Sequence, residues 1–213
     1  MPVRKILLVL GGEPPPIDLL AWYHEEAGLS IAVDSGWLAF IHAGIMPDVL
    51  IGDLDSCGDY SSNLNAGSQL QVVLNEDQEK TDFQKALSFI LDKNIPQEIV
   101  ILGALGKRTD HLLNNLSILS GIPEEIDVVL DSENEWIKRV TKNKPAVVKG
   151  RAGGTISLIS QSPQSLVSTS GLKWNLTDYM LTWGGKISQS NEFSSDISEI
   201  SVKSGTLLIF IQK

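Results

Sequence analysis

The most informative residues of this sequence are carboxylates that follow short apolar runs. Asp34 comes directly after one run, Asp53 and Asp55 follow the next, and Asp77 and Asp82 come after a third. In open parallel sheets, ligands bind beyond the carboxyl ends of the strands. If the apolar runs are neighbouring parallel strands, these carboxylates gather at one edge of a sheet.

Carboxylates that lie close together repel each other unless a cation sits among them. Mg²⁺ prefers such hard oxygen ligands and commonly shares them with substrate phosphates. The basic residues Lys80, Lys107 and Arg108 lie near the acidic segments in the sequence, where they could bind phosphate oxygens directly. Asp110 and His111 follow Arg108 closely. These residue types together predict a metal-dependent site for phosphate chemistry.

Each of these residues also has an ordinary structural explanation. Aspartate is common in turns and at the first positions of helices. Asp82 could belong to the first turn of its helix with Thr81 near the N-cap, and His111 could simply begin a helix. The glycine pair at 11–12 could be only a turn. The sequence has no G-x-x-x-x-G-K-[ST] loop and no G-x-G-x-x-G, so ordinary NTPase and dinucleotide sites lack support.

The segments that carry these residues alternate between strand-like and helix-like patterns. The clearest helix covers 81–91, because Phe83, Ala86, Leu87 and Ile90 fall on one of its faces. Such alternation predicts an α/β fold with a mostly parallel sheet and flanking helices. We expect strands at 5–10, 29–33, 49–51, 71–74, 99–102 and 126–130, and helices at 17–27, 37–43, 81–91 and 111–119.

The pattern changes after about Asp131, where helical periodicity stops. Short β-rich runs separated by Gly, Ser, Asn and Pro follow, and they are typical of an antiparallel sandwich or barrel. We therefore expect an α/β domain at 1–133 and a β-rich domain at 134–213. Its runs are expected at 155–159, 166–169, 179–183, 197–202 and 206–211.

Two segments of the β-rich half stand out from the strands around them. Trp174 lies between turn-like residues at 171–176, and the stretch at 188–193 is polar. The indole could stack on a flat heteroaromatic ligand. A tryptophan in the core is the alternative, and composition alone favours it.

The composition is that of a globular protein with an acidic surface. Hydrophobic residues make up 42% of the 213 residues and charged residues 20%, and the formal net charge is −9 with a pI of about 4.8. Such a surface repels nucleic-acid backbones and anionic membranes, so neither is an expected partner. Cys57 is the only cysteine, which agrees with a reducing, cytoplasmic location. The apolar run near the N-terminus is too short to span a membrane.

Taken together and in order, the motifs resemble those of the thiamine pyrophosphokinase family. The resemblance covers nearly the whole chain, and its motifs are specific jointly although each is weak alone. They are Asp-Ser-Gly at 34–36, Gly-Asp-Leu-Asp-Ser at 52–56, Asp-Gln-Glu-Lys-Thr-Asp-Phe at 77–83, Gly-Ala-Leu-Gly-Lys-Arg-Thr-Asp-His at 103–111, Gly-Leu-Lys-Trp at 171–174 and Ser-Asn-Glu at 190–192.

This resemblance implies a reaction and an architecture. The hydroxyl of thiamine attacks the β-phosphorus of ATP in the presence of Mg²⁺, so that thiamine diphosphate and AMP form. It also implies a nucleotide-binding α/β domain, a C-terminal antiparallel β-sandwich and a homodimer. The family's thiamine site lies between the first domain of one subunit and the sandwich of the other. There Trp174 would stack on thiamine, and Ser190 and Asn191 would contact it.

The resemblance also implies roles on the nucleotide side. As metal ligands that position the triphosphate, the family pattern gives Asp53, Asp55 and Asp82, with Asp34 and Asp77 nearby. Charge on the transferring group would be stabilised by Arg108 and Lys80, and Asp110 would lie near the nucleotide or the reacting hydroxyl. Three further side chains are expected to bind the nucleotide: Thr81, Lys107 and His111.

The sequence departs from the family pattern at three places. Ser35 stands where the family usually has a glycine, and a nearby asparagine of the family is absent. Lys107 replaces a frequent glycine, where it could contact phosphate or simply face solvent. Glu79 stands where the family often has aspartate, which lengthens the side chain but keeps its charge.

Two other functions compete with this one. The apolar run at 49–51 followed by Asp53 and Asp55 could suggest a haloacid-dehalogenase-type phosphatase, whose nucleophile is an aspartate after a strand. In that family the motif lies on the first strand, whereas here it lies on about the third, and no later lysine and acidic pair stands out. A protein that binds thiamine or a nucleotide without turnover is the other alternative. The acidic loops argue against it, because clustered charges cost free energy and a binding protein has little reason to keep them.

Overall fold

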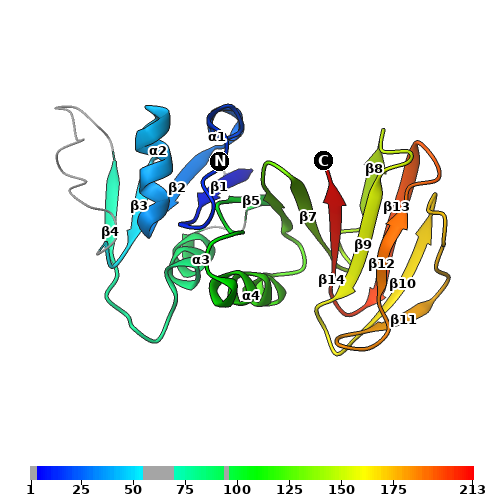
Figure 1. Cartoon of the computed structure of the whole chain (residues 1–213). Helices are drawn as coiled ribbons and strands as arrows, with labels where there is room; N and C mark the ends of the chain where they lie inside the picture. The colour runs from blue at the N-terminus through cyan, green and yellow to red at the C-terminus, as the bar shows by residue number, and fades with distance from the viewer. Residues whose placement is uncertain (1–3, 55–69, 94–95) are drawn as a thin grey trace. The chain divides into compact units, whose positions relative to one another are not determined.

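The computed structural model describes residues 4–54, 70–93 and 96–213. Contacts between residues divide the chain into two units. The first comprises Met1–Leu116 and Leu130–Glu133, and the second comprises Ser117–Val129 and Asn134–Lys213. Strand β6 (Asp127–Asp131) therefore belongs partly to each unit. Figure 1 labels the elements of both.

In the described part of the first unit, the sheet is built on the parallel strands β1 to β5. β1 pairs with β2 on one side and β5 on the other, and β3 and β4 follow β2. Apart from the largely exposed edge strand β4, the strands are nearly continuous buried runs, as expected for a parallel sheet with both faces covered. Their bounds are β1 (Lys5–Val9), β2 (Leu29–Val33), β3 (Val49–Gly52), β4 (Gln71–Leu74) and β5 (Glu98–Leu102).

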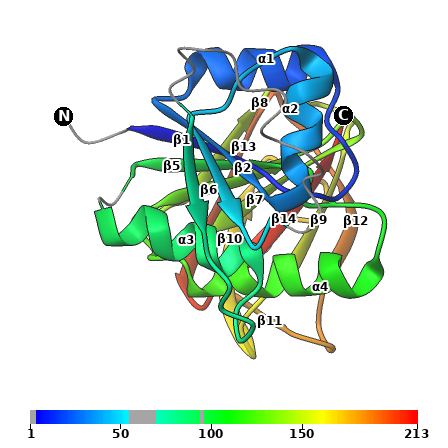
Figure 2. The ribbon, with the colours of Figure 1, turned by 90° about the vertical axis from the view of Figure 1, so that its left-hand side faces the viewer.

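Helices cover both faces of this sheet. Figures 1 and 2 show α1 and α2 on one face and α3 and α4 on the other. Within the described ranges, none of the helices has the length and apolar character that a membrane crossing would need. The helices are α1 (Ile17–Glu26), α2 (Trp37–Ala43), α3 (Asp82–Lys93) and α4 (Thr109–Ile118), with 3-10 turns η1 (Asp34–Gly36) and η3 (Leu119–Gly121).

Helix α3 follows the predicted pattern closely. The four residues expected on its apolar face, Phe83, Ala86, Leu87 and Ile90, are all buried. Thr81 lies just before the helix and exchanges hydrogen bonds with Gln84, since Gln84 N donates to Thr81 Oγ1 (3.3 Å) and Thr81 N donates to Gln84 Oε1 (3.0 Å). This reciprocal pair is a capping box, which fixes where the helix begins.

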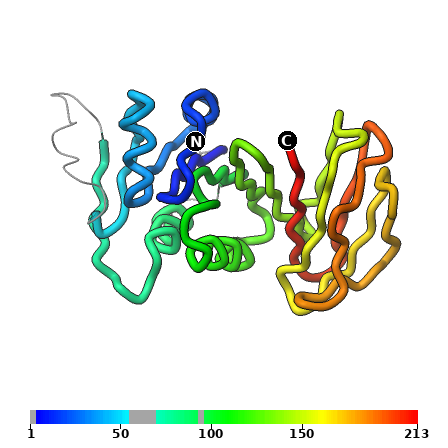
Figure 3. Tube along the Cα trace, in the orientation of Figure 1, coloured from blue at the N-terminus to red at the C-terminus, as the bar shows by residue number. Residues whose placement is uncertain are grey.

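The second unit contains two antiparallel sheets. One has the order β12-β9-β14-β7 and the other β11-β10-β13-β8. In Figure 3 the chain can be followed from β13 into β14, which belongs to the other sheet. The strands are β7 (Glu135–Val140), β8 (Ala146–Lys149), β9 (Thr155–Ser160), β10 (Gln164–Ser170), β11 (Tyr179–Thr182), β12 (Ser188–Glu192), β13 (Ile197–Ser204) and β14 (Leu207–Gln212).

One apolar core joins these two sheets. Val140, Ile156 and Ile209 from the first sheet belong to the same buried cluster as Val167 and Ile200 from the second. The structure therefore has the sandwich rather than the barrel, and the predicted fold class is confirmed. The sequence did not delimit β7, β8 and β12, because β12 is polar throughout and β7 contains adjacent charged residues.

A buried charge organises the segment between α4 and β6. Arg139 on β7 is 1% exposed, and its guanidinium donates to the carbonyl oxygens of Leu119, Ile122, Pro123 and Ile126 at 2.5–2.8 Å. Burial lowers the pKa of Arg139 to about 10, so the group stays charged at neutral pH. It supplies the hydrogen-bond donors that an irregular buried segment needs.

Candidate active site

The loops that follow β1 and β5 are joined backbone to backbone. Leu10 N donates to Leu102 O (2.9 Å), and Gly12 N donates to Gly103 O (2.7 Å). A Cβ atom at Gly12 would lie 2.4 Å from Gly103 O, so only glycine permits this approach. The glycine pair at 11–12 is therefore more than a turn, because it lets two strand ends meet.

The loops after β2 and β3 are also in contact. Val33 and Ile51 are partners in the parallel ladder, so the residues that follow them emerge at the same edge. A Cβ atom at Gly52 would lie 3.3 Å from Cβ of Asp34, which places Asp34 directly beside the residue that precedes Asp53. Asp34 adopts a left-handed φ of 46°, a conformation that costs free energy outside glycine and often marks functional loops.

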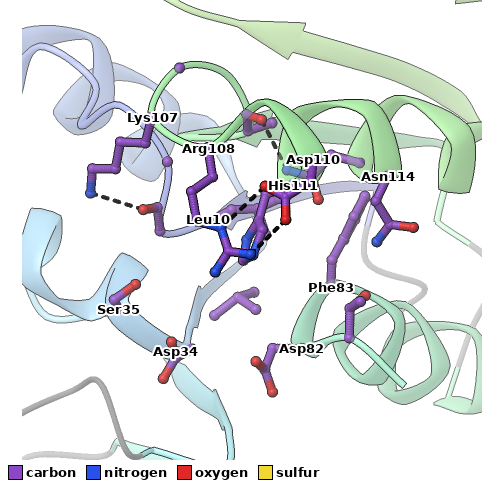
Figure 4. Close-up of a pocket in the computed structure, with 17 residues that line it drawn as sticks. Leu10, Asp34, Ser35, Asp82, Phe83, Lys107, Arg108, Asp110, His111 and Asn114 are labelled. Carbon is purple, nitrogen blue, oxygen red and sulfur yellow. Dashed lines mark hydrogen bonds and ion pairs between the residues drawn. The ribbon is translucent and has the colours of Figure 1, made fainter. Parts of the chain in front are cut away.

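These strand ends border a cavity of about 610 Å³ in the first unit (Figure 4). Basic side chains enter it from the loop before α4, and acidic side chains from the loop after β2 and the start of α3 lie across from them. The charged and polar lining includes Asp34, Asp82, Lys107, Arg108, Asp110 and His111. The cavity thus brings together six of the residues that the sequence singled out, among them the acids Asp34, Asp82 and Asp110.

Asp82 is paired with a buried cation, Lys85, that no motif of the sequence indicates. Lys85 is one turn further along α3, and its Nζ lies 2.8 Å from Oδ1 of Asp82. The lysine side chain is only 2% exposed, whereas that of Asp82 is 29% exposed. The sequence offered one sign of this burial, because the lysine directly precedes Ala86, which lies on the predicted apolar face of the helix. The pair fixes one carboxylate oxygen of Asp82 and leaves the residue at the cavity wall.

The basic side of the cavity is formed by Lys107 and Arg108. Lys107 has a left-handed φ of 51°, and its ammonium donates to the carbonyl oxygen of Gly11 (3.0 Å). Arg108 binds Asp110 through two hydrogen bonds, Nε to Oδ1 (3.1 Å) and a terminal nitrogen to Oδ2 (2.6 Å). The hydrogen bond from Arg108 lowers the pKa of the Asp110 carboxyl to about 2.

Several residues around the cavity act as structural supports. Ser35 fills the space beside Gly11, where a Cβ atom would lie 2.0 Å from Ser35 Oγ. Asn115, which the sequence analysis did not single out, donates from Nδ2 to the carbonyl oxygen of Ala104 (2.9 Å) and so ties α4 to the loop after β5. Thr81 lines the cavity and caps α3 at once.

Other expected site residues lie elsewhere. Among the described lining residues, Asp53, Asp77 and Lys80 are absent. Asp77 accepts a hydrogen bond from Glu79 N (2.9 Å), and Lys80 Nζ lies 4.0 Å from its carboxylate in an exposed turn. Asp55 lies outside the described residues.

The donor chemistry of the cavity fits a hard divalent cation such as Mg²⁺. Within the described ranges, no group of three or more His, Cys, Asp or Glu residues could hold a metal by itself. A magnesium ion that shares substrate phosphates needs only one or two protein carboxylates. Asp34 and Asp82 both line the cavity, so the residues present satisfy that requirement.

The second unit carries a separate candidate region around Trp174. Its indole is 58% exposed, so the alternative of a core tryptophan is wrong. Lys173 Nζ lies over the ring, 5.0 Å from the centroid, and forms an ion pair with Glu192 (2.9 Å). Ser190 is exposed, whereas Asn191 is 2% exposed. A flat aromatic surface is thus presented to solvent beside a polar strand.

Two family models match the chain. The first is described as "Thiamin pyrophosphokinase, catalytic domain" and matches residues 20–130. The second is described as "Thiamin pyrophosphokinase, vitamin B1 binding domain" and matches residues 143–207.

Individual relatives and a solved structure agree with these models. Thiamine pyrophosphokinase of Bacillus subtilis is 29% identical over 211 residues, which cover 97% of this chain and 98% of that protein. Thiamin pyrophosphokinase 1 of Caenorhabditis elegans is 30% identical over 97% of this chain and 88% of its own length. The crystal structure of the Bacillus subtilis protein matches with a TM-score of 0.83 and 28% identity over 99% of both chains.

Proposed function

The chain belongs to the thiamin pyrophosphokinase family, and from this premise we propose that it transfers the pyrophosphoryl group of ATP to the hydroxyl of thiamine. The products would be thiamine diphosphate and AMP. The observation that carries the proposal is the cavity of the first unit, where Asp34 and Asp82 lie across from Lys107 and Arg108. A polyphosphate bound with a divalent cation requires both kinds of charge in one place.

The basic side of the cavity is the proposed phosphate site. Arg108 forms two hydrogen bonds with Asp110, and Lys107 donates to the Gly11 carbonyl. Both precede the N-terminus of α4, where backbone N–H groups favour anions. Lys80, whose side chain is half exposed, is proposed to add positive charge from its turn. The remaining nucleotide contacts are assigned to Asp77, Thr81 and His111.

The acidic side is the proposed magnesium site. Its ligands would be Asp53, Asp55 and Asp82, with Asp34 beside them. When bound, the ion would neutralise charge on the triphosphate oxygens. Asp34 and Asp82 line the cavity, and Asp53 follows Gly52, which lies beside Asp34, so these positions support the proposal. The buried ammonium of Lys85 orients the Asp82 carboxylate through their ion pair.

The reaction needs little covalent chemistry from the protein. The thiamine hydroxyl loses its proton to solvent and its oxygen forms a bond to the β-phosphorus, while the bond from this phosphorus to the α-phosphate oxygen breaks and AMP leaves. Arg108 would stabilise charge on the transferring group, mainly through position. A carboxyl with a pKa of about 2 is a weak base, so we assign Asp110 to holding Arg108 rather than to accepting the hydroxyl proton.

The acceptor is assigned to the second unit. The exposed indole of Trp174 offers a stacking surface for a heteroaromatic ring, and the exposed Ser190 offers a hydroxyl nearby in the sequence. Following the family's arrangement, we propose a homodimer in which each acceptor site combines the cavity of one subunit with the Trp174 region of the other. A cytoplasmic location is proposed on the strength of the ATP requirement and the single cysteine.

A product assay tests the activity. The protein is incubated with thiamine, ATP and MgCl₂, and AMP and thiamine diphosphate are measured by chromatography. We expect the two products in equal amounts and only when all three components are present. Binding of thiamine without either product would favour a binding protein instead. Release of inorganic phosphate from generic phosphate esters would favour a phosphatase.

Subunit complementation tests the shared site. Asp53→Asn and Trp174→Ala proteins are mixed under conditions that allow subunits to exchange. At a thiamine concentration low enough that each variant alone has little activity, half of the dimers are mixed and one of their two sites is intact, so about a quarter of wild-type activity should return. If both halves of the site came from one chain, mixing would restore nothing, and the proposed interface site would be wrong.

A further inference from the structure

The turn that carries Trp174 is fastened to strand β12 at several points. Lys173 N donates to the carbonyl oxygen of Glu192 (2.9 Å), and Leu172 forms an isolated bridge with Phe193. Leu172 and Phe193 are themselves in the buried core of the sandwich. The backbone on each side of the exposed indole is therefore anchored in the sandwich.

Asn191 makes the contacts closest to the tryptophan. Its Oδ1 accepts hydrogen bonds from Trp174 N (3.2 Å) and Glu192 N (2.9 Å). Its Nδ2 donates to Trp174 O (2.8 Å) and to Ser188 Oγ (3.4 Å). A side-chain amide can accept two hydrogen bonds and donate two. All four are used inside the protein, and the side chain is only 2% exposed.

A distortion of the backbone beside Asn191 gives Ser190 and Asn191 different surroundings. Ser190 has a left-handed φ of 55°, and the pairing of β12 with β9 shifts register between Ser188 and Asn191. Such bulges redirect side chains and are common beside functional sites. Ser190 N donates to Ser157 Oγ (3.0 Å), which holds the bulge in place. As a result Ser190 is exposed while its neighbour Asn191 is buried.

We propose that Asn191 is a positioning residue for the acceptor: it binds both backbone polar groups of Trp174 and so fixes the indole, without contacting the acceptor itself. The proposal rests on the function proposed above, in which Trp174 stacks on thiamine. Ser190, which the bulge exposes, is then the residue of this pair that can meet the ligand. A stacking surface held in place before binding raises affinity, since less freedom is lost when the ligand arrives.

A double-mutant cycle tests the proposal. Steady-state constants are measured for Asn191→Ala, Trp174→Ala and the double variant. We expect Asn191→Ala to raise the KM for thiamine about tenfold, with the KM for ATP and kcat changed by less than about twofold. In the Trp174→Ala background, removal of the Asn191 amide should not raise the KM for thiamine further, because the amide acts only by positioning the indole.

Two controls separate positioning from general damage to the sandwich. Ser165→Ala removes another buried polar group of the same unit, whose hydroxyl donates to Thr206 O (2.9 Å), and it should leave the KM for thiamine unchanged. If Asn191→Ala does not fold, Asn191→Asp keeps the acceptor for Trp174 N and Glu192 N but loses the donor to Trp174 O. The same cycle is then run with that variant.

The outcomes distinguish this inference from the proposed function. An equal rise in thiamine KM in both backgrounds would show that Asn191 acts independently of Trp174 and would overturn the inference. So would a rise for Trp174→Ala together with no rise for Asn191→Ala. An unchanged thiamine KM in Trp174→Ala would instead refute the stacking role of the tryptophan, and the inference would fall with it.

Discussion

The cavity of the first unit and the Trp174 region of the second are built in opposite ways. The cavity gathers charged side chains from several strand ends, and pairs such as Arg108 with Asp110 remain 69% and 64% exposed. The Trp174 region depends on Asn191, which is neutral, buried and bound to backbone. Charge at strand ends can thus be recognised from a sequence, whereas the burial of the Asn191 amide and its hydrogen bonds to backbone cannot.

This contrast predicts different consequences for mutations in the two units. Where polar groups are buried and bound to backbone, substitution should lower the free energy of unfolding. Where charged groups line an open cavity or follow the strand ends beside it, substitution should lower activity and leave the fold intact. The four variants below test this division, from the largest expected effect to the smallest.

Arg139→Met should cause the largest loss of stability. The four carbonyl oxygens that now accept from the guanidinium would remain buried without these donors. We expect the free energy of unfolding to fall by about 3–5 kcal/mol, measured by urea denaturation. Arg139→Lys keeps the charge but can reach fewer carbonyl oxygens, so its free energy of unfolding should lie between those of the wild type and Arg139→Met. Equal stability of all three proteins would contradict the view that the second unit depends on buried polar pairs.

Asp53→Asn should abolish activity without unfolding the protein. It removes one charge from the proposed magnesium ligands while keeping the shape of the side chain, and kcat should fall at least about a hundredfold. The free energy of unfolding, measured in urea, should stay within about 0.5 kcal/mol of wild type. Asp92→Asn, an exposed acid on α3, makes the same change in net charge and serves as the control. Near-normal turnover of Asp53→Asn would remove this residue from the site.

Asp82→Asn should lower both activity and stability, because this acid lines the cavity and also pairs with a buried lysine. We expect a fall in kcat together with a loss of about 1–2 kcal/mol in stability, since the ammonium of Lys85 would keep a hydrogen-bond acceptor but lose its counter-charge. Calorimetry and the product assay on one sample measure both effects. Unchanged stability would mean that the ion pair contributes nothing to the fold.

Arg108→Ala should have the smallest effect on the fold but a clear effect on one titration. The pKa of Asp110, lowered to about 2 mainly by the hydrogen bond from Arg108, should rise toward the ordinary value of about 4. In the wild type this lowered pKa contributes stability that is present above the ordinary value and is lost as the pH falls toward 2. The variant should lack that dependence.

Carboxyl NMR titration measures the pKa directly. Lys107→Ala is the matched control, since its ammonium binds the Gly11 carbonyl and should leave the Asp110 titration unchanged. A low pKa that persists in Arg108→Ala would show that another group stabilises the Asp110 carboxylate.

The sequence determined those parts of the molecule that depend on local pattern. Continuous apolar runs predicted the buried strands β1, β2, β3 and β5, and the spacing from Phe83 to Ile90 predicted the buried face of α3. Aspartates after strand runs predicted an acidic edge, and Asp34 and Asp82 do share one cavity. These features follow from neighbours in the chain, because strand and helix periodicity fixes the direction of each side chain.

Only the tertiary structure decided the features that need partners far along the chain. Lys85 and Arg139 are ordinary polar residues in the sequence, and Asn191 was expected there only as a thiamine contact. Burial against specific partners gives all three their structural roles. The tertiary structure also decided that Trp174 is exposed, whereas the composition alone favoured a buried tryptophan. The physical reason is that a buried polar group is stable only when its hydrogen bonds are satisfied, and those partners are chosen by the fold rather than by sequence spacing.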